Sequence, residues 1–124
     1  MKGICVMRDI YRAINSFEQE FERVHGVCIN EAMTLCVLSE GELAASEIAR
    51  RAELTSSHCS KVIRSIEDKR LIVRTMGKTD KRQMYFRLSK AGENLLNSMR
   101  CGSVEVPDIL KPIFEKECSS QIGE

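Results

Sequence analysis

Apolar residues recur at helical spacing in the first part of the chain. They fall three or four positions apart, at Met7, Ile10, Tyr11, Ile14, Phe17, Phe21 and Val24. This pattern predicts an amphipathic helix over residues 7–24, and Gly26 ends it. The stretch from Ile4 to Met7 is apolar but ends at Arg8, so Cys5 is expected just before this helix.

Two further helices are predicted before residue 52. Asn30 followed by Glu31 has the form of an N-cap with a carboxylate at the positive end of a helix that runs to about Ser39. Ser46 repeats the cap signal for a short helix to Arg51. The residues expected to face the core are Ala32, Leu35, Cys36, Leu38, Ile48, Ala49 and Ala52.

The next helix carries the candidate chemistry. Thr55 or Ser56 caps a helix that extends to about Arg70, and Cys59, Val62, Ile63 and Ile66 form its apolar face. The other face presents short hydroxyls, an imidazole and two long cations, which are side chains that contact nucleic acids. The predicted contact residues on this face are Ser56, Ser57, His58, Ser60, Lys61 and Arg64.

A basic hairpin and two more helices complete the pattern. Residues 71–76 and 83–88 have strand patterns, with Met84, Phe86 and Leu88 alternating against polar positions. The turn between them carries Lys78, Lys81 and Arg82 and is long enough to reach a neighbouring groove. Ser89 caps a helix to about Arg100, and a last apolar helix is expected over about residues 105–118.

Charge is distributed unevenly along the chain. The net charge is +1, but residues 50–90 hold 12 basic and 4 acidic side chains, whereas residues 1–49 hold 4 basic and 8 acidic and residues 91–124 hold 3 and 6. A basic segment between acidic ones is typical of a surface that faces a polyanion, although it can also be a solvated face.

Length and composition exclude several classes of protein. A chain of 124 residues fits one domain over 1–124. No apolar run reaches the roughly 18 residues of a membrane helix, and the first apolar stretch is too short for a signal peptide, so we expect a cytoplasmic protein without a membrane partner. The six cysteines are widely spread, which favours reduced thiols. The sequence lacks nucleotide-binding, nucleophile and metal-ligand motifs, so we expect no enzyme, no cofactor and no metal site.

The order of the predicted elements indicates an architecture. A short helix, a tight turn, a helix with an exposed basic face and a basic hairpin form a winged helix-turn-helix. The predicted fold class is therefore mainly α with a small β-hairpin wing. The DNA-binding lobe would cover about residues 30–90, and the second helix of the motif would enter the major groove.

Two runs of residues match motifs of a known family. One extends from Leu54 to Arg74, and the other is Asp80-Lys81-Arg82 followed by Phe86, Leu88-Ser89 and Gly92. The first resembles the recognition helix and first wing strand of the multiple-antibiotic-resistance regulator (MarR) family, and the second resembles the wing signature of that family. The resemblance covers about residues 24–98. The resemblance implies a homodimer joined by the terminal helices, about 7–24 and 105–118, that reads a palindrome. It also implies that Arg82 contacts the minor groove and that Asp80 braces the wing by ion pairing.

Two features depart from the family. Arg70 stands where the family usually has Gly at the end of the recognition helix, and a left-handed cap there would be strained by roughly 1 kcal/mol, so we expect this end to be shaped differently. The C-terminal region is brief and holds two prolines. The resemblance also implies regulation by a small aromatic effector or by thiol oxidation, with Cys5 as the candidate redox sensor.

Two other functions compete with DNA binding. Some winged helices bind proteins, and others respond to thiol-bound metals, although no ligand cluster is present here. The cations that a protein-docking version would lose are all retained: Lys61, Arg64, Lys78, Lys81 and Arg82. We therefore expect a sequence-specific regulator of transcription, a repressor by default, that binds a palindromic operator as a homodimer.

Overall fold

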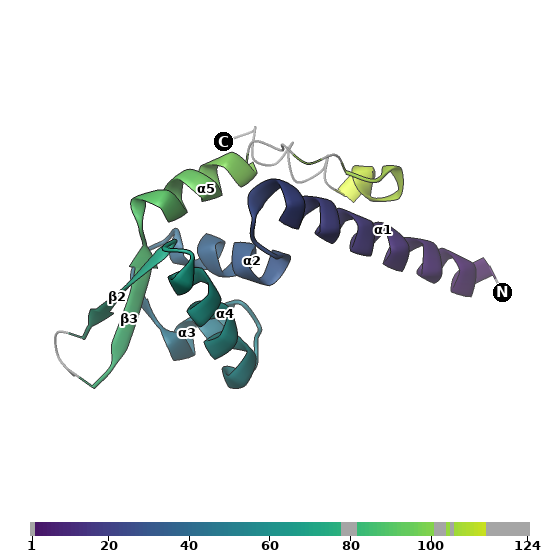
Figure 1. Cartoon of the computed structure of the whole chain (residues 1–124). Coiled ribbons are helices and arrows are strands. Elements are labelled where there is room, and N and C mark those ends of the chain that lie inside the picture. Colours follow the sequence, from purple (N-terminus) through teal and green to yellow (C-terminus); the bar gives the residue numbers. More distant parts are fainter. Residues whose placement is uncertain (1, 78–81, 101–103, 105, 114–124) are drawn as a thin grey trace. The chain divides into compact units, whose positions relative to one another are not determined.

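The computed structural model describes residues 2–77, 82–100, 104 and 106–113, and these are mainly helical (Figure 1). The elements are α1 (Lys2–His25), α2 (Ile29–Leu38), β1 (Leu43–Ala44), α3 (Ala45–Arg51), α4 (Ser56–Asp68), β2 (Ile72–Met76), β3 (Met84–Leu88), α5 (Lys90–Arg100) and the 3-10 helix η1 (Asp108–Leu110). The predicted fold class is confirmed. None of the described helices combines the length and the apolar character needed to cross a membrane.

The chain divides into two compact units, residues 27–101 and residues 1–26 with 102–124. The predicted DNA-binding lobe, about 30–90, lies inside the first of these, which we call the winged unit. The second, which we call the terminal unit, contains α1 and η1.

The core of the winged unit joins its helices to a small sheet. Leu35 of α2, Ile48 of α3 and Ile66 of α4 have no exposed surface. The antiparallel sheet has the order β1-β3-β2, so β3 is central, and Phe86 of β3 is 4% exposed. Strand β1 was not predicted, because its two residues are too few to show alternation and their pairing with Tyr85 and Phe86 is a long-range contact.

Three predicted helix starts were wrong by two to five residues. Helix α2 begins at Ile29, because the main-chain N–H of Cys28 donates to Glu31 Oε1 at 2.9 Å and closes the first turn two residues before Asn30. Helix α3 begins at Ala45 rather than after Ser46, because the chain leaves β1 directly into the helix. Helix α1 begins at Lys2, so Cys5 lies within it rather than before it. The apolar stretch before Arg8 contains no proline that would prevent it from joining the helix.

One predicted core residue of α2 faces outward. Cys36 is exposed, whereas Leu35 and Leu38 are buried. Because a helix of ten residues has one buried stripe, these two leucines occupy it and Cys36 lies outside it.

The junction between α4 and β2 is held by hydrogen bonds and close packing with the start of α5. Arg70 adopts a left-handed conformation with φ 61°, so the expectation that this end would be shaped differently was wrong. Its carbonyl accepts a hydrogen bond from Ser89 Oγ at 2.8 Å, and the Leu71 carbonyl accepts one from the N–H of Ser89 at 3.0 Å. A Cβ at Gly92 would lie 2.1 Å from the Leu71 carbonyl oxygen, so only glycine permits this approach. These contacts hold the left-handed turn in place despite its strain.

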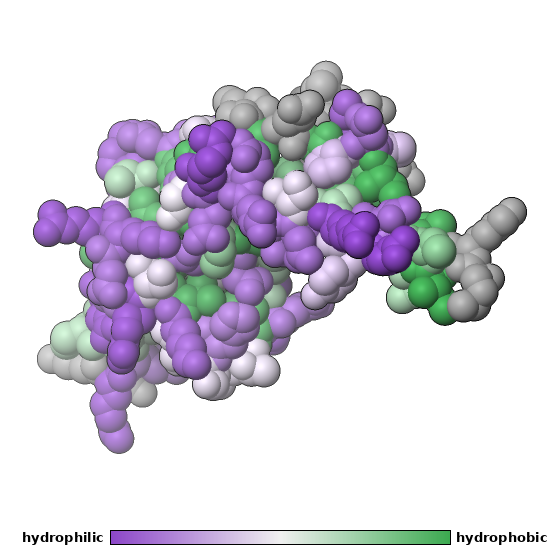
Figure 2. Space-filling model, turned by 45° about the vertical axis from the view of Figure 1, so that its right-hand side comes forward, coloured by the Kyte–Doolittle hydropathy of each residue, from purple (hydrophilic) through white to green (hydrophobic). Residues whose placement is uncertain are grey.

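The terminal unit presents an apolar helix face. Figure 2 shows green atoms over the N-terminal part of α1, at the right of the view. Large apolar side chains of α1 that remain exposed are Ile4, Val6, Met7, Ile10, Tyr11, Ile14 and Val24. Phe21 is buried, and its ring lies 4.6 Å from that of His25. The start of the last helix, predicted over about 105–118, was wrong, because Val106 and Pro107 are not helical and Pro107 caps η1. Helical residues follow at 111–113, and residues 105 and 114–118 lie outside the described residues.

Candidate nucleic-acid interface

Helix α4 separates a buried face from an exposed one, as predicted. Thr55 caps the helix, since its Oγ1 accepts the main-chain N–H of His58 at 3.1 Å. Cys59, Val62, Ile63 and Ile66 are buried. All six predicted contact residues on the other face are exposed: Ser56, Ser57, His58, Ser60, Lys61 and Arg64.

The cations on the exposed face of α4 differ from those of α3 in whether they form ion pairs with carboxylates. Lys61 and Arg64 form no ion pair with any carboxylate in the described part of the chain. In α3, by contrast, Arg50 and Arg51 both pair with Glu47, and their hydrogen bonds lower the pKa of that carboxyl to about 2. The α4 cations are therefore available to an external anion, whereas the α3 arginines are already partly neutralised.

The hydroxyls and the imidazole are partly engaged by the protein. Ser60 Oγ donates to the Ser56 carbonyl at 3.0 Å, which leaves its lone pairs as acceptors. His58 Nε2 lies 3.5 Å from Nδ2 of Asn30 in α2. Asn30, expected only as a helix cap, therefore borders the exposed face of α4; no local pattern indicates a contact between residues so far apart in the chain.

Glu31 anchors α4 to the N-terminus of α2. Its side chain is almost fully buried and accepts hydrogen bonds from Ser65 Oγ at 2.7 Å and from Lys69 Nζ at 2.9 Å, in addition to the Cys28 N–H. Burial raises the pKa of this carboxyl, but the Cys28 N–H, Lys69 and Ser65 outweigh it and hold the pKa below its usual value. Glu31 is thus ionised and fixes the position of α4 along its last two turns.

A second ion pair connects α4 to the wing, which we define as β2, β3 and the turn between them. Arg74 of β2 donates from Nε and Nη2 to the two carboxylate oxygens of Glu67, both at 2.9 Å. Its guanidinium carbon lies 5.4 Å from the ring centre of Phe86, its partner across the strands. One side chain therefore contacts α4 and both wing strands, a role that the sequence pattern did not indicate.

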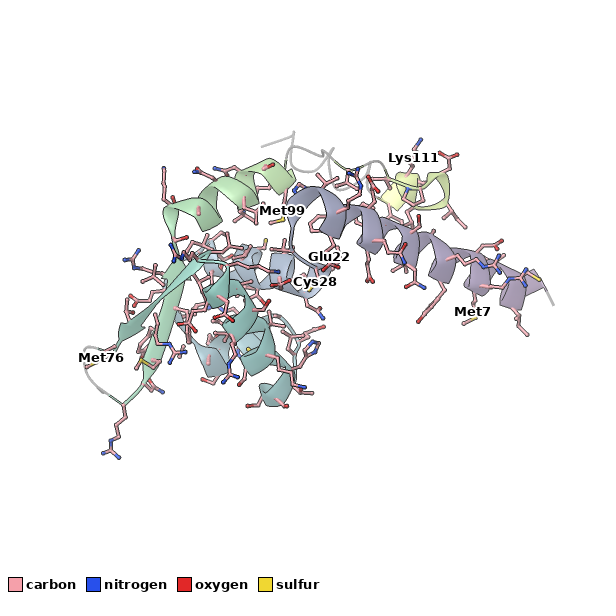
Figure 3. All side chains as sticks on the ribbon, viewed as in Figure 1. Met7, Glu22, Cys28, Met76, Met99 and Lys111 are labelled. Carbon is pink, nitrogen blue, oxygen red and sulfur yellow. The ribbon has the colours of Figure 1, made fainter. Side chains whose placement is uncertain are left out.

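The turn of the wing is described in part. Arg82 is exposed, whereas Lys78, Asp80 and Lys81 lie outside the described residues. Met76 and Met84 end the two strands beside the turn, where Figure 3 labels Met76, and both are exposed. Met84 lies on the apolar face that its alternation with Phe86 predicted. At Met84 this face is exposed, whereas at Phe86 it belongs to the core.

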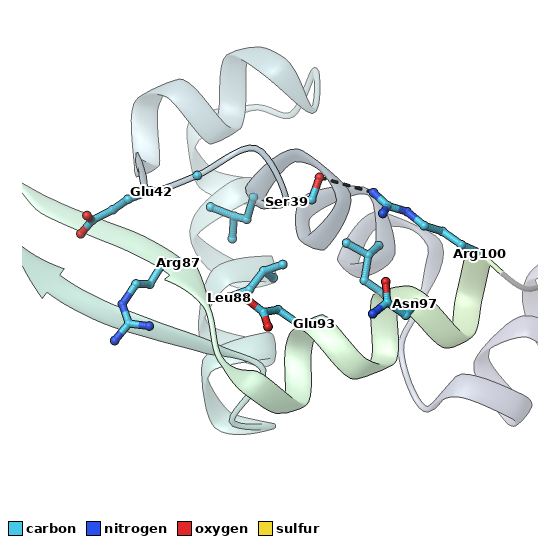
Figure 4. Close-up of a pocket in the computed structure, with 10 residues that line it drawn as sticks. Ser39, Glu42, Arg87, Leu88, Glu93, Asn97 and Arg100 are labelled. Carbon is cyan, nitrogen blue, oxygen red and sulfur yellow. Dashed lines mark hydrogen bonds between the residues drawn. The ribbon is translucent and has the colours of Figure 1, made fainter. Parts of the chain in front are cut away.

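A cavity of about 450 Å³ lies between α2, β3 and α5 (Figure 4). Leu38, Leu88 and Leu96 contribute apolar surface. Arg87 and Arg100 contribute positive charge, and Glu42 and Glu93 contribute negative charge. Arg100 Nη2 lies 3.5 Å from Ser39 Oγ. The cavity therefore combines apolar walls with two guanidinium groups and two carboxylates, so the formal charges of its lining balance.

The described cysteines are free thiols in different environments. Cys5 is exposed in α1, Cys36 is exposed in α2, and burial raises the pKa of Cys28 and of Cys59. A raised pKa disfavours the reactive thiolate, so Cys28 and Cys59 are poor redox sensors. Among the residues that the structure describes, no three His, Cys, Asp or Glu side chains gather closely enough to hold a metal ion.

A sequence profile described as Winged helix DNA-binding domain matches residues 30–92, which is half of the chain. The chain belongs to the winged helix DNA-binding family. The match covers α2 to the start of α5 and includes α4 and the wing. In this winged helix domain, α3 and α4 form the helix-turn-helix, and α4 occupies the place of the recognition helix.

Individual relatives agree with this assignment. The chain is 25% identical over 119 residues to the HTH-type transcriptional regulator MhqR of Bacillus subtilis, covering 94% of this chain and 82% of that protein. A crystal structure of a MepR-like protein complexed with pseudoligands shares the fold with a TM-score of 0.77 at 17% identity, covering 98% and 87% of the two chains. The S. aureus MepR–DNA complex has a TM-score of 0.67 at 19% identity, covering 99% and 83%. The resemblance to MarR-family regulators is confirmed.

Proposed function

We propose that this winged helix protein is a transcriptional regulator, acting as a repressor, that binds a palindromic operator in double-stranded DNA as a homodimer. The observation that carries the proposal is the exposed face of α4, whose two cations have no ion-pair partner in the described structure, whereas the arginines of α3 pair with Glu47. Both the family and the relative MhqR, a transcriptional regulator, support it.

The proposed mode of binding places α4 in the major groove. Lys61 and Arg64 would donate to guanine O6 and N7 or to phosphates, and the serine hydroxyls and His58 would contact either. Glu31 and Glu67 hold α4 at fixed positions on α2 and on the wing, so the face would be presented without reordering. A rigid reading face loses less entropy on binding.

The wing would contact the adjacent minor groove. Arg82 would enter the groove, Asp80 would brace the turn, and Lys78 and Lys81 would contact phosphates. The resemblance to the MarR family and the exposed position of Arg82 support this assignment.

The terminal unit supplies the reason for a homodimer. Met7, Tyr11 and Ile14 are 71%, 68% and 41% exposed and recur at helical spacing. A continuous apolar stripe of this kind on an otherwise charged helix marks an interface between proteins. A second copy of α1 would cover the stripe, and two winged units would then read the two halves of a palindrome.

Regulation by a small molecule is a further part of the proposal. The cavity between α2, β3 and α5 supports a small aromatic effector, because its leucine side chains would contact the ring. Thiol oxidation is the other candidate signal, because Cys5 is a free thiol exposed on α1. A cytoplasmic location is proposed because a repressor acts where the DNA is.

Selection from a random-sequence duplex library tests the proposal, with the oligomeric state measured by sedimentation. We expect the dimer to enrich a two-fold palindrome with half-sites about one helical turn apart, and to bind it more weakly at higher salt. No enrichment, with only weak salt-sensitive binding or none, would contradict sequence-specific regulation and would favour a winged helix that binds another protein.

A further inference from the structure

Two methionines form an exposed apolar pair at the outer end of the wing. Met76 of β2 and Met84 of β3 are directly opposite each other in the strand register and are 57% and 38% exposed. They are the last paired residues before the turn, which the Gly77 N–H closes by donating to the Gln83 carbonyl at 2.9 Å. Figure 2 shows pale green atoms beside the grey turn at the lower left, where the wing ends.

The pair lies on the sheet face that packs against α4. Side chains alternate along a strand, so Met76 and Met84 share a face with Arg74 and Phe86. Phe86 is buried in the core, and Arg74 reaches Glu67 at the end of α4. On this face, the Met76–Met84 pair is the next cross-strand pair toward the turn after Arg74–Phe86, and it lies beyond the core of the winged unit.

The pair has no evident role in stability. The charged guanidinium of Arg74 lies over Phe86, the neighbouring core residue on this face, and Met76 and Met84 both remain exposed. Single exposed apolar residues are common, but two that face each other next to a basic turn form a small patch. The thioether is flexible and polarisable, so methionine adapts to irregular surfaces.

We propose that Met76 and Met84 pack against the deoxyribose wall of the DNA minor groove when the wing binds there. The inference rests on the proposed function and extends it by assigning an apolar contact to the wing. Three observations favour DNA as the occupant: the patch adjoins Arg82 in the sequence, it shares the face that leads to α4, and its segment carries the excess of positive charge. The sugar edges of the groove are apolar. Proteins that bind the minor groove frequently insert apolar side chains into it, methionine included.

Salt dependence separates this contact from an ionic one. A cation that binds phosphate releases counterions, so its removal lowers the slope of log affinity against log salt by about one unit. An apolar contact releases no counterions. Removing it lowers affinity equally at every salt concentration and leaves the slope unchanged.

The experiment compares the full-length protein with the double variant Met76→Gln, Met84→Gln. The probe is the duplex that the unaltered protein enriches from the random library, titrated over a range of salt concentrations. We expect the double variant to bind roughly 5- to 20-fold more weakly with an unchanged salt slope and an unchanged melting temperature, as for the loss of a modest apolar contact. The double variant Met76→Leu, Met84→Leu keeps an apolar surface and should retain most of the affinity.

Met33→Gln is the matched control. Met33 lies in α2 of the same unit and is 41% exposed, close to the value for Met84, and its substitution should leave affinity unchanged. The inference is overturned if the Gln double variant binds as tightly as the unaltered protein, if its salt slope falls as for Arg82→Ala, or if its oligomeric state changes instead. If the unaltered protein binds no duplex at all, the proposed function fails and the inference with it.

Discussion

Arg74 and Glu67 form a two-point ion pair that fixes the wing to α4, with both N···O distances at 2.9 Å. Glu67 lies in the last turn of α4, and Arg74 is the third residue of β2. The pair raises the pKa of the Arg74 guanidinium, which is charged in any case. Its consequence is geometric, because a planar fork that binds both oxygens sets the direction in which the wing leaves the helix.

Arg74→Lys should weaken DNA binding more than it weakens the fold. Lysine cannot form the two-point contact, but the pair is partly exposed, so we expect a loss of only about 0.2 to 1 kcal/mol in the free energy of unfolding. Affinity for the selected duplex should fall further because the wing is less well oriented. The measurement pairs urea unfolding with DNA titration.

A double-mutant cycle with Arg82→Ala identifies the cause. If Arg74 acts by positioning the wing, the effects of the two substitutions on affinity should overlap, with a coupling of about 0.5 kcal/mol or more. Fully additive effects would argue against positioning. Arg23→Lys, which disrupts a similar Arg–Glu pair in α1, is the control and should leave duplex binding by the winged unit unchanged.

Glu31→Gln should destabilise the winged unit and remove part of its acid sensitivity. The pKa of Glu31 is lower in the folded chain than in the unfolded one, so the unfolded state takes up the proton first. The ionised carboxyl therefore contributes stability above its unfolded pKa, and this contribution is lost as pH falls through the folded pKa. Near neutral pH we expect Gln to cost about 1 to 3 kcal/mol, since Lys69 loses its partner.

Urea unfolding near pH 7 and near pH 4 tests this expectation. The difference in stability between the unaltered protein and Glu31→Gln should shrink at the lower pH. Glu18→Gln, at an exposed position of α1, should show no such change. An equal difference at both pH values would mean that the carboxyl does not act through its charge.

Arg70→Gly should stabilise the protein by up to about 1 kcal/mol. Arg70 holds a φ of 61°, which is costly for a residue with a Cβ, and glycine removes that cost while it adds some entropy to the unfolded chain. Asp68→Gly, at the last residue of α4, should instead destabilise. Thermal unfolding of both variants gives the comparison, and a loss of stability in Arg70→Gly would refute the assigned strain.

Gly92→Ala should destabilise strongly, by about 2 kcal/mol or more, because a methyl group would meet the rigid Leu71 carbonyl at 2.1 Å. The junction between α4 and β2 would have to move, so DNA affinity should fall as well. Gly3→Ala is the control, since nothing lies within 4 Å of the added methyl in α1. We expect that variant to be neutral or slightly more stable.

Lys61→Ala and Arg64→Ala test the reading face of α4. Each should weaken binding to the selected duplex without changing stability, because neither side chain is buried or paired with a described carboxylate. A base contact would reduce discrimination against altered operators by about 1 to 3 kcal/mol, whereas a phosphate contact would lower the salt slope by about one unit for all sequences. If affinity and sequence preference both survive, the face is misassigned.

Local pattern was sufficient for the elements and for the chemistry of the exposed faces. Helical spacing placed Cys59, Val62, Ile63 and Ile66 on the buried side of α4, and the structure confirms it. The caps at Thr55 and Ser89 are confirmed because a hydroxyl beside a helix start acts within three residues. That these exposed residues contact DNA stays a prediction, as does the role of the wing residues outside the described chain, Lys78, Asp80 and Lys81.

Relationships between distant residues were decided only by the tertiary structure. The contacts of Glu31 with Ser65 and Lys69, the pair of Asn30 with His58 and the pairing of β1 with β3 join segments that are far apart in the sequence. Arg70 keeps its left-handed backbone conformation because the contacts of Ser89 and Gly92 with the junction outweigh the preference of a non-glycine residue for negative φ. Amphipathic spacing and capping depend on neighbours within a turn or two, so both can be predicted from the sequence alone. Packing, strain and the assignment of each ion pair depend on which surfaces meet, and only the folded chain determines that.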